Sequence, residues 1–274
     1  MVEFIDALFS YAFLSRALAA GLLISLCAAL LGVSMVLRRY SMIGDGLSHV
    51  GFGAVALAAA MNLAPLTVAI PGVLVAALLL LRFTGSGKLK GDAAIAMISS
   101  VALSIGVIIV AKADGVNIDL NSYLFGSILV ISESDLWLSV ILAAAVLVLF
   151  VGLYSRIFTI TFDETFARAT GVRTGAFNTL IAVLMAVTIV LGMRMMGSLL
   201  ISAVIIFPTL SAMRLCRSFK GVTIAAALVA VLGFTIGLII SFVWGTPVGA
   251  SIVVVNFAIF VITAIIGRIY PEKH

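Results

Sequence analysis

Long runs without a charged side chain dominate this sequence and constrain its fold more than any motif does. The clearest lie at residues 17–37, 93–111 and 174–193, and each has about the 20 residues that an α-helix needs to cross a bilayer. Only 10% of the 274 residues are charged and 64% are hydrophobic, whereas about a quarter of the residues in soluble proteins are charged. The sequence therefore predicts an all-α, polytopic membrane protein.

Two further runs are too long for one helix and contain residues that break helices. Residues 50–81 include Pro65 and Pro71, and residues 221–267 include Pro247, so each run predicts two spans joined by a turn. Single spans at 136–155 and 195–213 bring the total to about nine, with eight or ten as alternatives. We expect residues 1–274 to form a single transmembrane domain.

The distribution of basic residues predicts the orientation of the chain in the membrane. If the N-terminus lies outside, 13 of the 16 Lys and Arg residues fall in cytoplasmic connections, and only Arg16, Lys112 and Arg194 fall outside. We therefore expect an N-out, C-in topology with an odd number of spans. The net charge of +5 then belongs to the cytoplasmic face and does not indicate nucleic-acid binding. Arg194 is expected to extend to the lipid headgroups.

Asp45 and His49 form the candidate functional site, within the glycine-rich stretch GDGLSH at 44–49. Ionisable side chains inside membrane sequence are costly and usually functional. At positions i and i+4 the two side chains share one helix face, with Cβ atoms about 5–6 Å apart, and carboxylate with imidazole suits zinc, manganese or iron. The alternative is structural: Asp45 would cap a helix that begins after Ser41, and His49 would bond a neighbouring carbonyl.

A second candidate element is the predicted cytoplasmic loop at 161–172. Thr161 and Glu164 fit a capping box, and Gly171 fits a helix stop, so the loop predicts a short independent helix. Phe162 and Phe166 would give this helix an apolar face for lipid or for a partner protein. The chain has no G-x-x-x-x-G-K-[ST] phosphate-binding loop, so an ATPase that drove transport would be a separate chain.

Five stretches, in this order, resemble the permease subunits of the zinc/manganese ABC importers: 37–49, 122–129, 162–172, 197–208 and 245–249. The resemblance implies a type II importer-like permease that dimerises, with two ATPase subunits below it and a metal-binding protein outside. It implies that Asp45 and His49 contact the metal on a dimer-axis path, so that two pairs supply four ligands, as a tetrahedral zinc site needs.

The resemblance also implies that 161–172 docks into the ATPase. The coupling residues would be Asp163, Glu164, Phe166, Ala167 and Gly171. The expected protein is a multi-pass component of a prokaryotic cell membrane. It has no enzyme activity and no permanent cofactor, and it passes Zn²⁺ or Mn²⁺ to the cytoplasm.

Other functions remain open from the residues alone. An ABC permease for an iron chelate or cobalamin would need no fixed metal ligands, and a proton-coupled carrier would need more buried carboxylates than this chain offers. A membrane hydrolase is disfavoured, because no nucleophile accompanies the His–Asp pair and no HExxH motif is present. Pro208 predicts a helix kink, with gating as a second possibility. The ligand types do not choose between zinc, manganese and iron.

Overall fold

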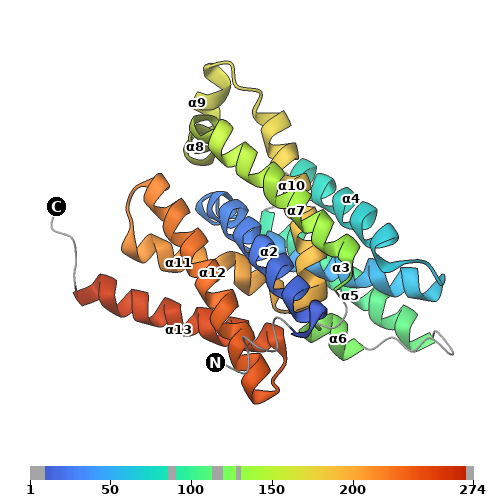
Figure 1. Cartoon of the computed structure of the whole chain (residues 1–274). Helices are drawn as coiled ribbons and strands as arrows, with labels where there is room; N and C mark the ends of the chain where they lie inside the picture. The colour runs from blue at the N-terminus through green and yellow to red at the C-terminus, as the bar shows by residue number, and fades with distance from the viewer. Residues whose placement is uncertain (1–9, 86–90, 113–119, 128–130, 270–274) are drawn as a thin grey trace.

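The structure, a computed structural model, describes residues 10–85, 91–112, 120–127 and 131–269 (Figure 1). All regular elements in these ranges are α-helices, which confirms the predicted fold class. In chain order they are α2 (Ala12–Leu37), α3 (Ile43–Ala60), α4 (Pro65–Gly85), α5 (Gly91–Lys112), α6 (Leu120–Phe125), α7 (Glu133–Gly152), α8 (Tyr154–Phe162), α9 (Glu164–Ala169), α10 (Thr174–Met196), α11 (Ile201–Leu215), α12 (Phe219–Trp244) and α13 (Val248–Ile269).

The predicted set of about nine spans is confirmed. Eight of the helices in the described ranges are long and apolar enough to cross a membrane, and α11 is a shorter apolar helix. The two overlong runs divide as expected, between α3 and α4 and between α12 and α13. One boundary differs from the apolar run that begins at residue 50: α3 begins at Ile43, so Asp45 and His49 both lie on this helix.

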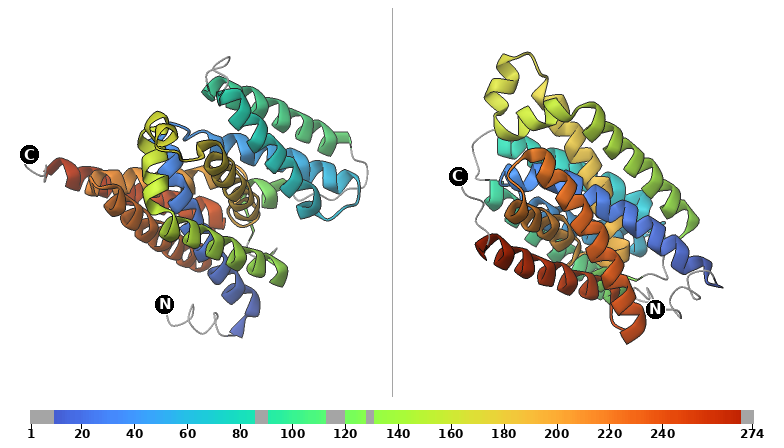
Figure 2. Two further views of the ribbon diagram at one scale, coloured as in Figure 1. Left: turned by 90° about the horizontal axis from the view of Figure 1, so that it is seen from above. Right: turned by 60° about the vertical axis from the view of Figure 1, so that its left-hand side comes forward.

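Helices α2 and α10 lie at the centre of the bundle. In their most apolar windows 72% and 67% of the residues are buried, against 22% for α5. Helices α3, α4 and α5 pack on one side of this central pair, and α11, α12 and α13 pack on the other (Figure 2). The candidate pair on α3 therefore sits between the buried centre of the bundle and the exposed helix α5.

Three of the stretches that carry the family resemblance meet at one end of the bundle. A Cβ on Gly126 would lie 2.1 Å from the Met195 carbonyl oxygen, and one on Gly249 would lie 1.9 Å from the Met196 oxygen. Gly197 is equally crowded by the 124–125 backbone and has φ +89°. Only glycine permits such close backbone approach. Helices α8 and α9 project at the opposite end, at the top of Figure 1.

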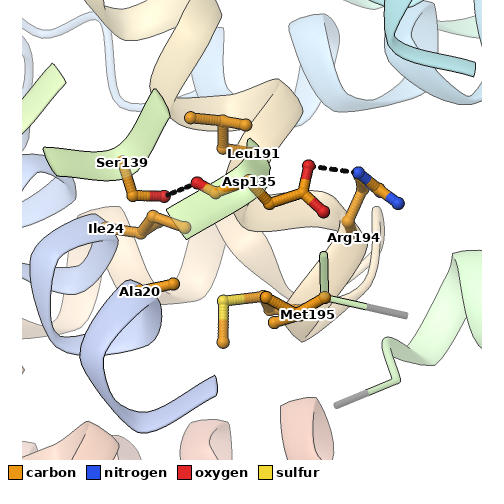
Figure 3. A pocket seen from close by; sticks show the side chains of 8 residues that line it. Ala20, Ile24, Asp135, Ser139, Leu191, Arg194 and Met195 are labelled. Atoms are coloured by element: carbon orange, nitrogen blue, oxygen red, sulfur yellow. Dashed lines mark hydrogen bonds and ion pairs between the residues drawn. The ribbon is translucent and has the colours of Figure 1, made fainter. Parts of the chain in front are cut away.

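A buried ion pair joins α7 to α10 near the end where the glycines meet (Figure 3). Arg194 donates to Asp135, and their side chains are only 15% and 8% exposed. Asp135 also completes a capping box with Ser132 at the start of α7. The expectation that Arg194 extends to the headgroups is therefore wrong, because a carboxylate 59 residues away in sequence holds it inside the bundle.

Candidate functional site

Asp45 lies in the first turn of α3, one turn before His49. The N-cap of α3 is Met42, with no side-chain hydrogen bond to the helix start, so Asp45 is not the capping residue. His49 Nδ1 is buried and has no hydrogen-bond partner among the described residues. Both parts of the structural alternative are therefore contradicted. Among the described residues, Asp45 does not cap the helix and His49 Nδ1 does not bond a carbonyl.

Close packing of α3 against α5 gives this region its shape. A Cβ on Gly53 would lie 2.8 Å from the Ala102 carbonyl oxygen, and a Cβ on Gly46 would lie 2.6 Å from Cγ2 of Ile95. The two helices therefore approach more closely than larger residues would allow. This close approach brings a serine-bearing face of α5 beside Asp45 and His49.

A cavity of about 480 Å³ opens beside the pair, lined by α3, its N-cap and α5. The lining residues are Met42, Asp45, His49, Ile95, Ala96, Ser99, Ser100 and Leu103. The sequence analysis missed Ser99 and Ser100. Their signal was the helical spacing of 95/96, 99/100 and 103, which places both hydroxyls on one face of α5.

The pair is spaced as two ligands of one ion would be. His49 Nε2 lies 3.6 Å from Asp45 Oδ2, which is too long for a hydrogen bond. Zinc bonds of about 2.0–2.2 Å in tetrahedral geometry place neighbouring ligand atoms roughly 3.4 Å apart. The two atoms can therefore approach one cation together with little movement.

Burial differs between the two ligands. The His49 side chain is 10% exposed, whereas that of Asp45 is 34% exposed. Since Nδ1 has no described partner, packing orients the imidazole ring. No group of three or more His, Cys, Asp or Glu side chains that could hold a metal occurs in the described part of the chain. Within the described residues, one chain brings only Asp45 and His49 together here, and Asp45 is the more exposed of the two.

The segment expected to form one helix at 161–172 is two helices, α8 and α9, broken at Asp163. Asp163 accepts a hydrogen bond from the Phe166 N–H and caps α9. The predicted capping box is wrong, because Thr161 lies inside α8, where its hydroxyl donates to the Ile157 carbonyl. Gly171, with φ +84°, ends the segment as expected.

The predicted coupling residues take different positions on this segment. Phe166 is 58% exposed and Phe162 is 60% exposed. Phe162 packs against Phe158 with ring centroids 5.0 Å apart, beside Phe219 at the start of α12. Ala167 is fully buried and cannot touch a partner. The apolar surface available to a partner is therefore the exposed phenylalanine face.

Glu164 faces the bundle through two arginines. Its carboxylate accepts from Arg38 Nη2 at 2.7 Å and from Arg168 Nη2 at 2.6 Å. Burial by itself raises the pKa of Glu164. The hydrogen bond from Arg168 and the charges of Arg38 and Arg168 lower the pKa by more, so it lies below its ordinary value of 4.5. The ionised carboxylate therefore adds stability above pH 4.5, and this contribution is lost as the pH falls through the lowered pKa.

Pro208 lies inside α11 and is buried. Met193, Met195 and Met196, which flank Arg194 in the sequence, are also buried. These positions do not line the cavity beside Asp45 and His49.

The described residues form eight helices long and apolar enough to cross a membrane and the shorter apolar helix α11, which is the architecture of a multi-pass membrane protein, with Asp45 and His49 on α3. The ABC 3 transport family matches residues 10–267, and the chain belongs to this family. As a permease of this family it is a transport component and not an enzyme, with ATP hydrolysis on a separate chain.

Similar proteins cover nearly the whole chain. The manganese import system permease protein ScaB of Streptococcus parasanguinis is 30% identical over 97% of this chain and 95% of its own length. The high-affinity zinc uptake system membrane protein ZnuB of Haemophilus influenzae is 29% identical over 90% of this chain and 95% of its own. The structure of PsaBC from Streptococcus pneumoniae in complex with Fab matches with a TM-score of 0.86 and 30% identity, covering 100% of this chain and 99% of that one.

Proposed function

We propose that this chain is the permease subunit of an ATP-driven importer for a divalent transition-metal ion, manganese or zinc. The ion passes from an extracytoplasmic binding protein to the cytoplasm, and Asp45 and His49 contact it on the way. The observation that carries the proposal is the 3.6 Å spacing of Asp45 Oδ2 and His49 Nε2 beside a cavity of about 480 Å³. The relatives named as manganese and zinc systems support the choice of cargo.

The proposed path needs a second copy of the chain, because one Asp–His pair is too few ligands to replace the water around a divalent ion. The cavity is lined by one face of α5, and the exposed Val107 lies on that same face by helical spacing. A homodimer that buries this face of α5 brings two pairs together on its axis. Hydroxyls of Ser99 and Ser100 then supply further oxygens, directly or through water.

The exposed phenylalanine face of α8 and α9 serves as the docking surface for the separate ATPase chain. Phe162 and Phe166 offer large apolar groups at the end where Arg38 and Arg39 also lie, and the positive-inside rule assigns that end to the cytoplasm. Asp163 and Gly171 fix the start and end of α9, so they act on its shape. Pro208 would permit α11 to bend during gating.

The direct test is metal uptake by cells that express the permease with its ATPase and binding protein, with manganese and zinc supplied separately. His49→Ala and Asp45→Ala should each abolish uptake while the protein still inserts in the membrane. His274→Ala removes the chain's other histidine and serves as the matched control. Loss for one metal only identifies the cargo.

Normal uptake by His49→Ala, of a metal that the wild type clearly imports, would remove this pair from the path. A wild-type system that imports neither metal would point to another ABC cargo, such as a metal chelate.

A further inference from the structure

One buried guanidinium joins three helices at the end of the bundle where α9 lies. Arg38 is the C-cap residue of α2, and its side chain is 11% exposed. Its Nη1 donates to Asn178 Oδ1 on α10 at 2.7 Å, and its Nη2 donates to Glu164 Oε2 on α9 at 2.7 Å. The planar, forked arginine head presents two separate nitrogens to these acceptors in a fixed geometry, which the single ammonium of lysine does not.

Arg38 also belongs to the short connection that leads into α3. Its guanidinium carbon lies 5.7 Å from the centre of the Tyr40 ring. The connection is tightly bonded: the Tyr40 N–H donates to the Met35 carbonyl, and the Ile43 N–H donates to the Tyr40 carbonyl. Ile43 is the first residue of α3 and lines a small cavity of about 20 Å³ together with Arg38 and Asn178. Little free space therefore separates Arg38 from the start of α3.

The second arginine on Glu164 makes a different connection. Arg168 Nη2 donates to Glu164 Oε1 at 2.6 Å, and its Nε donates to Thr174 Oγ1 at 2.9 Å. Its side chain is 68% exposed. Arg168 thus links α9 to the first residue of α10. Neither of these two hydrogen bonds reaches the connection before α3. Within this cluster, Arg38 provides the contact between α9 and that connection.

We propose that Arg38 is a positioning residue that transmits movement of α9 to the metal-contacting helix α3 through its ion pair with Glu164. This inference rests on the proposed function. When the ATPase moves α9, the pair carries the displacement to the connection at 38–42. Asp45 follows that connection by three residues, so the half-site shifts with it. A fully solvated pair would transmit little, but here the Arg38 side chain is only 11% exposed and that of Glu164 is 30% exposed.

The test uses the complete complex of permease, ATPase and binding protein in lipid vesicles, and it measures metal taken up per ATP hydrolysed. Arg38→Gln and Glu164→Gln should each lower this ratio about tenfold, within the range usual for coupling between sites. ATP hydrolysis, co-purification of the ATPase and metal binding at Asp45 and His49 should persist. The double variant should be no worse than either single one, because both remove the same link.

Arg168→Gln is the matched control, since it removes the other arginine from the same carboxylate. Its uptake per ATP should stay within about twofold of wild type, because the Arg38 pair remains. Glu164→Gln keeps the side-chain shape, so it remains informative if Arg38→Gln fails to fold. A wild-type ratio in Glu164→Gln, or loss of the ATPase from that complex, would overturn the proposed link.

Asp45→Asn in the same vesicles separates the two proposals. If Asp45→Asn imports metal normally, the proposed function of the pair fails whatever the Arg38 variants do. If Asp45→Asn abolishes uptake while Arg38→Gln and Glu164→Gln keep the wild-type ratio, only the link is wrong.

Discussion

At the scale of single residues, the proposed function depends on two side-chain atoms that face each other without bonding. Asp45 Oδ2 and His49 Nε2 are 3.6 Å apart, close enough to share an ion and too far apart to satisfy each other. A cation between them would therefore displace no existing hydrogen bond of the pair. A transport site gains from such modest pre-organisation, because the ion must leave as well as enter.

Ser99 provides a test of the cavity wall. Ser99→Ala should reduce manganese uptake at subsaturating metal by about fivefold, as expected for the loss of one oxygen contact worth about 1 kcal/mol. Zinc uptake should fall less, because zinc prefers nitrogen and sulfur ligands and fewer of them. Uptake assays with each metal measure the difference.

Ser104→Ala is the control for Ser99→Ala. Ser104 lies on the same helix and donates to the Ser100 carbonyl at 2.7 Å, but it does not line the cavity. Equal losses in the two variants would argue against a role for Ser99 in the metal path.

The candidate pair could be predicted from sequence because both residues lie within one helical turn. The bonds of Arg38 and Arg194 could not, since their acidic partners are 126 and 59 residues away. Serines in apolar helices usually bond their own backbone, so the spacing of Ser99 did not identify it as a site residue until α5 was placed beside α3. Local spacing identifies neighbours on one helix, whereas contacts between helices depend on packing.

At the scale of helices, glycines decide how close α3 and α5 lie. Gly53→Ala would place a methyl group 2.8 Å from the Ala102 carbonyl oxygen, a backbone atom that cannot move aside easily. Overpacking of this kind costs about 1–3 kcal/mol, which exceeds the gain in helix propensity of up to about 1 kcal/mol. We expect a lower melting temperature in detergent and reduced uptake.

Gly152→Ala gives the comparison, because no atom lies within 4 Å of a Cβ at that position. It should melt at or above the wild-type temperature. Equal destabilisation of both variants would mean that α3 and α5 are not held at close distance in the membrane.

The helix pattern was predicted well from apolar runs, whereas the detail of the α8–α9 segment was not. Thr161 and Glu164 have the spacing of a capping box, but Asp163 lies between them and is itself a strong N-cap residue. Helix α8 therefore continues through Thr161, and Glu164 is free to pair with Arg38. When two possible N-cap residues lie this close together, the sequence alone does not show which one starts the helix, because contacts with neighbouring helices also decide it.

At the scale of the whole molecule, the two ends differ in character. Helix α9 bonds to Thr174 at the start of α10, whereas Gly249 packs on Met196 at its end. A helix of 23 residues separates these points by about 34 Å. The structure thus places α9 and the 245–249 turn at opposite ends of a membrane-spanning helix. The predicted N-out orientation would put the turn outside and α9 in the cytoplasm.

Thiol labelling of intact cells tests this orientation. In a chain without Cys27 and Cys216, Trp244→Cys should react with a membrane-impermeant reagent, because this exposed position is expected outside. Thr165→Cys on α9 should react only after the membrane is permeabilised. The reverse pattern would require the C-terminus to lie outside.

The most direct test of the central claim is the number of metal ions bound by the purified permease–ATPase complex at equilibrium. Two half-sites on a dimer axis predict one manganese or zinc ion per two permease chains, and Asp45→Asn should abolish this binding. One ion per chain, or binding that survives Asp45→Asn, would contradict a shared metal site built from Asp45 and His49.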